Sequence, residues 1–169
     1  PGNHKIKPSS ISSEVLVLFI FLRVATLGSG NFSPIKDFKT FEASGPETAK
    51  VVKSITGKEL PKPRLATLRK INNTNTSELI DEGIIIWFPG PDSYTGEDMS
   101  EIHVHGGKAV ILAVQKEISK IKNCKLAEPG EFTKLAFQNG KINLLKAESI
   151  ADLRSAESEF QRLQAVIIM

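Results

Sequence analysis

The chain has 169 residues with 40% hydrophobic and 24% charged residues, a composition that excludes an intrinsically disordered polypeptide. A chain of this length buries a core without disulfides, and its single cysteine, Cys124, excludes a disulfide within it and favours a reducing compartment. The formal charge of +3 is compatible with an RNA partner but does not require one, because no dense block of Lys and Arg is present.

Residues 1–40 form an atypical N-terminal segment with one long apolar run, at residues 15–22. The run is too short to span a bilayer as a helix. It favours a buried strand or helix over the apolar region of a signal peptide, because no clear cleavage site follows it. The sequence at 28–31, Gly-Ser-Gly-Asn, is typical of a turn. We expect no transmembrane segment.

A first helix is predicted directly after Ser44. Ser44 and Glu47 have the spacing of a capping box, and Pro46 suits the first turn of a helix. Gly57 ends the pattern. The apolar face of this helix consists of Val51, Val52 and Ile55.

The middle of the chain alternates between strand and helix patterns. The run at 83–88, GIIIWF, indicates a strand buried on both faces. Apolar spacing predicts a helix near 108–121, and Asn139-Gly140 is typical of a helix end. The other predicted elements are strands at 64–71, 101–105 and 125–127 and a short helix at 131–138. This pattern predicts an α/β (α+β) fold, in which helices pack on a mixed sheet.

From Asn143 onward, apolar residues recur at helical spacing over about seven turns, which predicts one long C-terminal helix. Such a helix needs partners to cover its apolar stripe, so we expect it to project with that stripe under-packed. The stripe consists of Leu145, Ile150, Leu153, Phe160, Leu163 and Ile167.

The strand at 101–105 places Glu101, His103 and His105 on one face of the sheet. A metal site is one interpretation, but no third ligand of fixed spacing supports it, and we expect His103 to bond a carboxylate or the backbone instead. A second interpretation uses Glu101 alone. A carboxylate there can accept two parallel N–H bonds from the edge of a pterin or guanine ring. No Walker A motif is present, so GTP binding by a P-loop is excluded for this chain.

Four motifs occur in one order along the chain: WFPGPDSYTGED at 87–98, EIHVHGG at 101–107, LAEPGEFTKLAFQNGK at 126–141 and LLKAESIADL at 144–153. Together they resemble the N-terminal folate-binding domain of the MnmE/TrmE family of tRNA-modifying GTPases. The resemblance implies a family domain at 41–141 and the start of a helical domain at 142–169, with the GTPase domain missing from this chain.

The resemblance also implies a function. The fold is expected to be similar to folate-binding aminomethyltransferase domains, to bind 5-formyltetrahydrofolate through Glu101 and Lys141, and to form a homodimer. It implies no catalytic residue and no metal in this domain. GTP, Mg and K would belong to the GTPase domain of the full-length family.

With the flavoprotein MnmG (GidA), family members modify C5 of the wobble uridine in tRNA. The implied location is the cytoplasm of a bacterium, or the mitochondrion in a eukaryote, without membrane association. Two alternatives remain: a free-standing folate-dependent aminomethyl- or methyltransferase domain, and a ligand-free dimerisation fragment. Two residues depart from the family pattern: Glu42 stands where an Arg is usual, and Arg154 where an apolar residue is usual.

Overall fold

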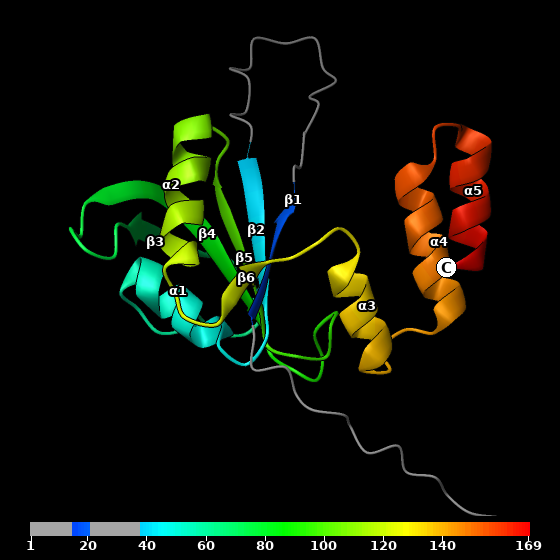
Figure 1. Ribbon diagram of the computed structural model, residues 1–169, viewed down its shortest axis with the longest axis horizontal. Coiled ribbons are helices and arrows are strands. Elements are labelled where there is room, and N and C mark those ends of the chain that lie inside the picture. The colour runs from blue at the N-terminus through cyan, green and yellow to red at the C-terminus, as the bar shows by residue number, and fades with distance from the viewer. Residues whose placement is uncertain (1–14, 21–37) are drawn as a thin grey trace, which may run out of the picture.

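The computed structural model describes residues 15–20 and 38–169, which form a six-stranded sheet with helices on both sides (Figure 1). The strand order is β3-β4-β5-β2-β1-β6. The pair β1 and β6 is parallel and the other pairs are antiparallel, so the predicted mixed sheet of an α+β fold is confirmed. The strands are β1 Val15–Ile20, β2 Phe38–Ser44, β3 Thr67–Asn72, β4 Leu79–Phe88, β5 Met99–His105 and β6 Cys124–Leu126.

The helices divide between the two sides of the sheet (Figure 1). Helices α1 (Thr48–Thr56) and α2 (Lys108–Ser119) cover one face. Helices α3 (Glu131–Gln138), α4 (Leu144–Ser155) and α5 (Glu159–Ile168) lie on the other side. Residues 15–20 of the apolar run near the N-terminus form the strand β1, whereas the turn expected at 28–31 lies outside the described residues.

The core lies between the sheet and the pair α1 and α2. Phe41, Ile102 and Ile85 are aligned across three neighbouring strands, and all three are fully buried. The residues that follow them alternate to the opposite face. There Ile84 and Ile86 are only partly buried, so the prediction that this strand is buried on both faces is wrong. The helices that cover this core contribute Val51, Val52, Ile55, Val114 and Ile118.

The predicted capping box of α1 is also wrong. Ser44 is the last residue of β2, and its Oγ lies 2.7 Å from the Oγ1 of Thr95 in a buried hydrogen bond. The first turn of α1 is held instead by Thr48, whose hydroxyl donates to the carbonyl of Asp98 at 3.0 Å. Gly57 ends α1 in the left-handed conformation, as predicted.

The C-terminal segment forms two helices, α4 and α5, rather than the single long helix that was predicted. Ala156 is extended, and Ser158 and Gln161 form a capping box that starts α5. The apolar stripe is under-packed as expected, since Phe160 and Ile167 are 69% and 82% exposed. None of the described helices has the length and apolar character needed to cross a membrane.

A buried carboxylate on α2 fixes the turn between β3 and β4. Glu117 is 2% exposed and accepts hydrogen bonds from the backbone N–H and hydroxyl of Thr74 at 3.0 and 2.7 Å. Its two oxygens also accept from the Nζ of Lys120, at 2.7 and 2.8 Å. The Lys120 bond, with the Thr74 bonds, lowers the pKa of Glu117 to about 2 against the opposing effect of burial.

We therefore expect Glu117→Gln to lower the free energy of unfolding at pH 7 by about 1–3 kcal/mol, because charge-assisted bonds to a buried group are lost. Since the folded pKa is depressed, this stability is present above the unfolded pKa of 4.5 and is lost as pH falls toward about 2. Urea unfolding at several pH values measures it. Glu148→Gln, at an exposed position on α4, is the control, and an equal effect of both substitutions contradicts the assignment.

Candidate functional site

The sheet face opposite α1 and α2 carries two rows of polar residues. Glu42 of β2 is the register partner of Glu101 of β5, which in turn pairs with Ile86 of β4. Two residues further along each strand, Thr40 of β2 pairs with His103 of β5. Because direct partners in an antiparallel pair share a face, the two carboxylates lie side by side above the sheet.

His103 connects the two rows. Its Nε2 lies 2.9 Å from the Oε2 of Glu101, and its Nδ1 lies 3.0 Å from the hydroxyl of Thr40. His105 is held separately, since its Nδ1 and backbone N–H both bond the carboxylate of Asp81, at 2.8 Å each. The expected hydrogen bond of His103 to a carboxylate is confirmed. The two histidines bind different carboxylates, and the described residues contain no group of three or more His, Cys, Asp or Glu able to hold a metal ion.

The position of Glu42 perturbs its carboxyl group. Partial burial raises the pKa of Glu42 from 4.5 to about 7, the negative charge of Glu101 adds to the rise, and His103 opposes it. The other neighbouring strand, β1, contributes no charge, because its sequence VLVLFI has no titratable residue. Near neutral pH the pair therefore carries fewer than two negative charges on average.

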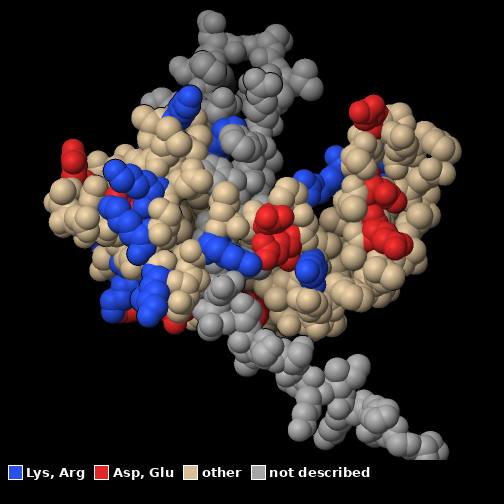
Figure 2. All heavy atoms as spheres, viewed as in Figure 1, with Lys and Arg blue, Asp and Glu red and all other residues tan. Residues whose placement is uncertain are grey.

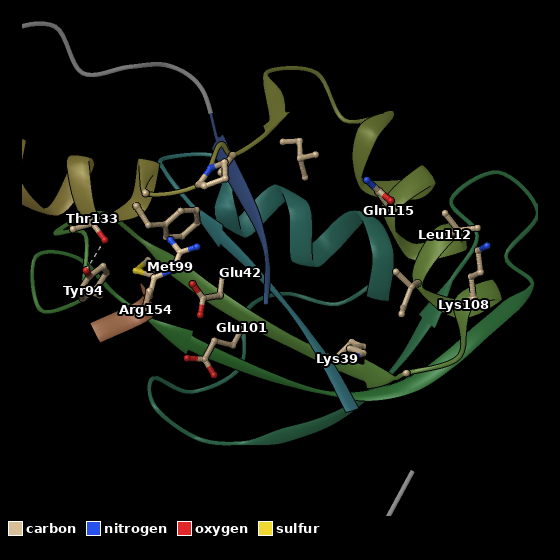
Figure 3. Close-up of a pocket in the computed structure, with 17 residues that line it drawn as sticks. Lys39, Glu42, Tyr94, Met99, Glu101, Lys108, Leu112, Gln115, Thr133 and Arg154 are labelled. Carbon is tan, nitrogen blue, oxygen red and sulfur yellow. Dashed lines mark hydrogen bonds between the residues drawn. The ribbon is translucent and has the colours of Figure 1, made fainter. Parts of the chain in front are cut away.

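A cavity of about 1270 Å³ adjoins these carboxylates. Figure 3 shows Glu42, Glu101, Met99 and Arg154 together with residues of α3 and the loop before β5, and a further group on α2. The wall near the carboxylates is largely apolar and includes Met99, Ala127 and Phe132, while the guanidinium of Arg154 enters from α4. An apolar cavity with a few polar groups is typical of a small-molecule site.

Helix α3 and the residues after it make three hydrogen bonds to the loop at 89–98, which borders the cavity. The hydroxyl of Tyr94 lies 3.1 Å from that of Thr133 on α3. The side-chain amide of Asn139 donates to the carbonyl of Thr95 at 2.8 Å, and the Nζ of Lys141 donates to the carbonyl of Pro91 at 2.7 Å. The residues that follow α3 thus clamp the loop.

The structure separates the two residues that sequence reasoning selected. Glu101 lines the cavity, whereas Lys141 is exposed and supports the neighbouring loop without lining the cavity. Sequence reasoning missed Tyr94 and Thr133, which lie within the recognised motifs, as cavity residues. In the sequence, Arg154 stood out only as a charged residue at a position where an apolar one is usual. That substitution was the sequence signal for its place in the cavity wall.

The fold is an α+β domain with a cavity that extends from the carboxylates of Glu42 and Glu101 to residues of α2. The family model described as "GTP-binding protein TrmE N-terminus" matches residues 38–141, which is more than half of the chain. The chain therefore belongs to the TrmE N-terminal family.

Curated relatives extend the comparison. The tRNA modification GTPase MnmE of Pelagibacter ubique (strain HTCC1062) is 74% identical over 126 residues, covering 75% of this chain and 28% of the relative. That of Phenylobacterium zucineum (strain HLK1) is 49% identical over 123 residues, covering 73% and 27%. The mitochondrial 5-taurinomethyluridine-[tRNA] synthase subunit GTPB3 of Danio rerio is 47% identical over 123 residues, covering 73% and 24%. The chain thus spans about a quarter of the length of these relatives.

The raised pKa of Glu42 predicts a pH-dependent stability. A carboxyl group whose folded pKa exceeds its unfolded value stabilises the fold fully below pH 4.5, and this contribution is lost as pH rises through about 7. Glu42→Gln does not titrate. We therefore expect the variant to be more stable than the parent by about 1–3 kcal/mol at pH 8, with the difference vanishing near pH 4.5.

Urea unfolding of both proteins between pH 4.5 and 8 measures this difference. Glu82→Gln, which replaces an exposed carboxylate on β4, two strands away from β2, serves as the control. If Glu42→Gln and the parent protein show parallel pH profiles, Glu42 does not titrate in this range in the folded protein.

Proposed function

We propose that this chain is the folate-binding and dimerisation module of a GTPase that modifies C5 of the wobble uridine in tRNA. The observation that carries the proposal is the cavity beside Glu101, within the segment that matches the TrmE N-terminal family. Its volume of about 1270 Å³ exceeds the range typical of small-molecule sites, so it can accommodate 5-formyltetrahydrofolate.

The residues near Glu101 fit a folate. The carboxylate of Glu101 offers two acceptor oxygens to the paired N–H donors of a pterin ring, and its hydrogen bond to His103 holds it in place. Met99 and Phe132 supply apolar surface for the ring. When bound, the folate supplies a one-carbon unit. The chain's own residues bind and orient the ligand, and none of them is assigned a catalytic role.

Lys141 is the second proposed folate contact. In the folded chain its amine is bonded to the carbonyl of Pro91, at the surface beside the cavity. A long flexible side chain can exchange a backbone carbonyl for an anionic ligand group at little cost, because both partners are exposed. Lys141 therefore combines two roles, as a support of the 89–98 loop and as a cation available to the ligand.

The remaining partners follow from the names of the relatives and from the family resemblance. We propose tRNA as the substrate of the full assembly, a second copy of the chain and the flavoprotein MnmG as protein partners, and GTP, Mg and K as ligands of the GTPase domain. The proposed location is the bacterial cytoplasm or the mitochondrion. A free-standing folate-dependent transferase is the weaker alternative, because the exposed stripe of α4 and α5 indicates further helical partners.

We expect Glu101→Gln to weaken binding of 5-formyltetrahydrofolate by about 1–3 kcal/mol, because one of two charge-assisted acceptors becomes a donor. Isothermal titration calorimetry with the 169-residue chain measures the change. Glu82→Gln is the matched control and leaves affinity unchanged. If the parent chain shows no affinity for this folate, the ligand assignment is wrong and the interpretation as a ligand-free dimerisation fragment remains.

A second titration concerns the clamp after α3. We expect Lys141→Met to weaken folate binding by about 1 kcal/mol or more, because both the loop contact and the cation are lost. Lys141→Arg keeps the charge and restores most of the affinity. Equal affinity of the parent and Lys141→Met contradicts a role for this residue in binding.

A further inference from the structure

The charges of the chain are distributed unevenly between the two sides of the sheet. The segments that contain α1 and α2, residues 47–59 and 108–125, hold eight lysines and three glutamates. The rest of residues 38–169 holds ten basic and fourteen acidic residues. Figure 2 shows Lys and Arg gathered over the part of the surface where α1 and α2 lie. Positive charge is therefore in excess in the segments that contain α1 and α2, and negative charge is in excess in the rest of residues 38–169.

Four exposed lysines define this basic side, and we call them the lysine face: Lys50 and Lys53 on α1, Lys116 on α2 and Lys122 directly after it. The two helices contact each other. The lysine face therefore spans two helices that pack against each other.

The acidic residues within these segments do little to neutralise the lysine face. Glu117 points inward, 2% exposed, and is neutralised by Lys120. Glu47 and Glu59 pair with Lys50 and Lys53 at the surface. Exposed pairs of this kind contribute about 0–1 kcal/mol, so an incoming phosphate readily displaces them. Among the described residues no salt bridge involves Lys116 or Lys122.

The composition of this side favours a nucleic-acid backbone over other anionic partners. A membrane surface needs apolar anchors beside the charges, and a protein interface is usually centred on aromatic residues or Arg. Segments 47–59 and 108–125 contain neither Arg nor an aromatic residue, and among the large hydrophobic residues of α1 and α2 only Leu112 is exposed. Flexible lysines without stacking residues contact phosphates and do not read bases.

We infer that the lysine face is an RNA-binding surface, which contacts the phosphate backbone of tRNA without base specificity. The inference rests on the proposed function, which makes tRNA the substrate of the assembly. It adds the location of the contact, on the side of the sheet opposite the carboxylates of Glu42 and Glu101. The substrate RNA and the folate would then be held on opposite faces of one sheet.

Fluorescence anisotropy of a fluorescein-labelled tRNA transcript, titrated with the 169-residue chain at several NaCl concentrations, tests the inference. The test variant is Lys50→Ala/Lys116→Ala/Lys122→Ala. The control is Lys134→Ala/Lys146→Ala/Arg162→Ala, which removes the same charge from α3, α4 and α5, at two exposed positions and the half-buried Lys146.

We expect the test variant to bind tRNA about tenfold or more weakly, with a salt dependence shallower by roughly 0.7–0.9 per lysine removed. We expect the control to remain within about twofold of the parent, because its cations lie outside the contact. Equal losses in both variants overturn the inference, since they would reflect net charge alone. Binding to poly-L-glutamate or phosphatidylglycerol vesicles, without binding to tRNA, also overturns it.

Titration of the parent and the test variant with 5-formyltetrahydrofolate separates this inference from the proposed function. Unchanged folate affinity in the test variant shows that its fold and ligand site are intact, so a loss of tRNA binding is then specific to the lysine face. A parent chain that binds folate but not tRNA refutes the RNA surface and leaves the folate module standing. A parent chain that binds tRNA but not folate refutes only the ligand assignment.

Discussion

The antiparallel register of β2 and β5 is the constraint on which the rest of the structure depends. It places Phe41 against Ile102 on one face and Glu42 against Glu101 on the other. Because side chains alternate along a strand, a slip of one residue would move the carboxylates into the core and expose the largest buried side chain. Burial of Phe41 and Ile102 therefore fixes the position of the carboxylate pair.

That pair has a free-energy cost which the surrounding residues only partly offset. The negative charge of Glu101 and partial burial both disfavour the charged form of Glu42. His103 compensates by bonding Glu101, and its second ring nitrogen is fixed by Thr40. A strained polar cluster next to an apolar cavity is stabilised further by any ligand that donates hydrogen bonds to it. This is the physical basis for proposing a ligand site on this face.

Strong local patterns were predicted well from the sequence. The strand at 101–105, the helix at 131–138 and the left-handed Gly57 each depend on residues close together in the chain. The errors arose where distant residues decide the outcome. Ser44 matches a helix cap, but its hydroxyl is bonded to Thr95, 51 positions away. The prediction of one long C-terminal helix was wrong for a local reason. Ser158 and Gln161 form a capping box that starts a new helix, and the periodic apolar pattern around them hid this signal.

Only part of the candidate site could be predicted from the sequence, because the rest depends on contacts between residues far apart in the chain. Glu101 followed from strand alternation, which is local, and from a family motif. The Glu42 carboxyl became part of the site through its pairing with Glu101, which joins residues 59 positions apart. Arg154 and Lys141 depend on how the helices after the sheet return to it, and no periodicity encodes that return.

The sheet also separates the two charged surfaces of the molecule. Between the carboxylate pair and the lysine face lies one layer of buried side chains, centred on Phe41 and Ile102 and covered by α1 and α2. Electrostatic interactions are stronger through a buried core of low dielectric constant than through water. The lysines, however, are exposed to solvent, where salt screens their charges within about 8–10 Å. Substitutions on one face therefore leave the electrostatic environment of the other nearly unchanged unless they disturb the shared core. A change at Phe41, by contrast, alters both surfaces together, since the strands that carry the carboxylates and the helices that carry the lysines share the core cluster to which Phe41 belongs.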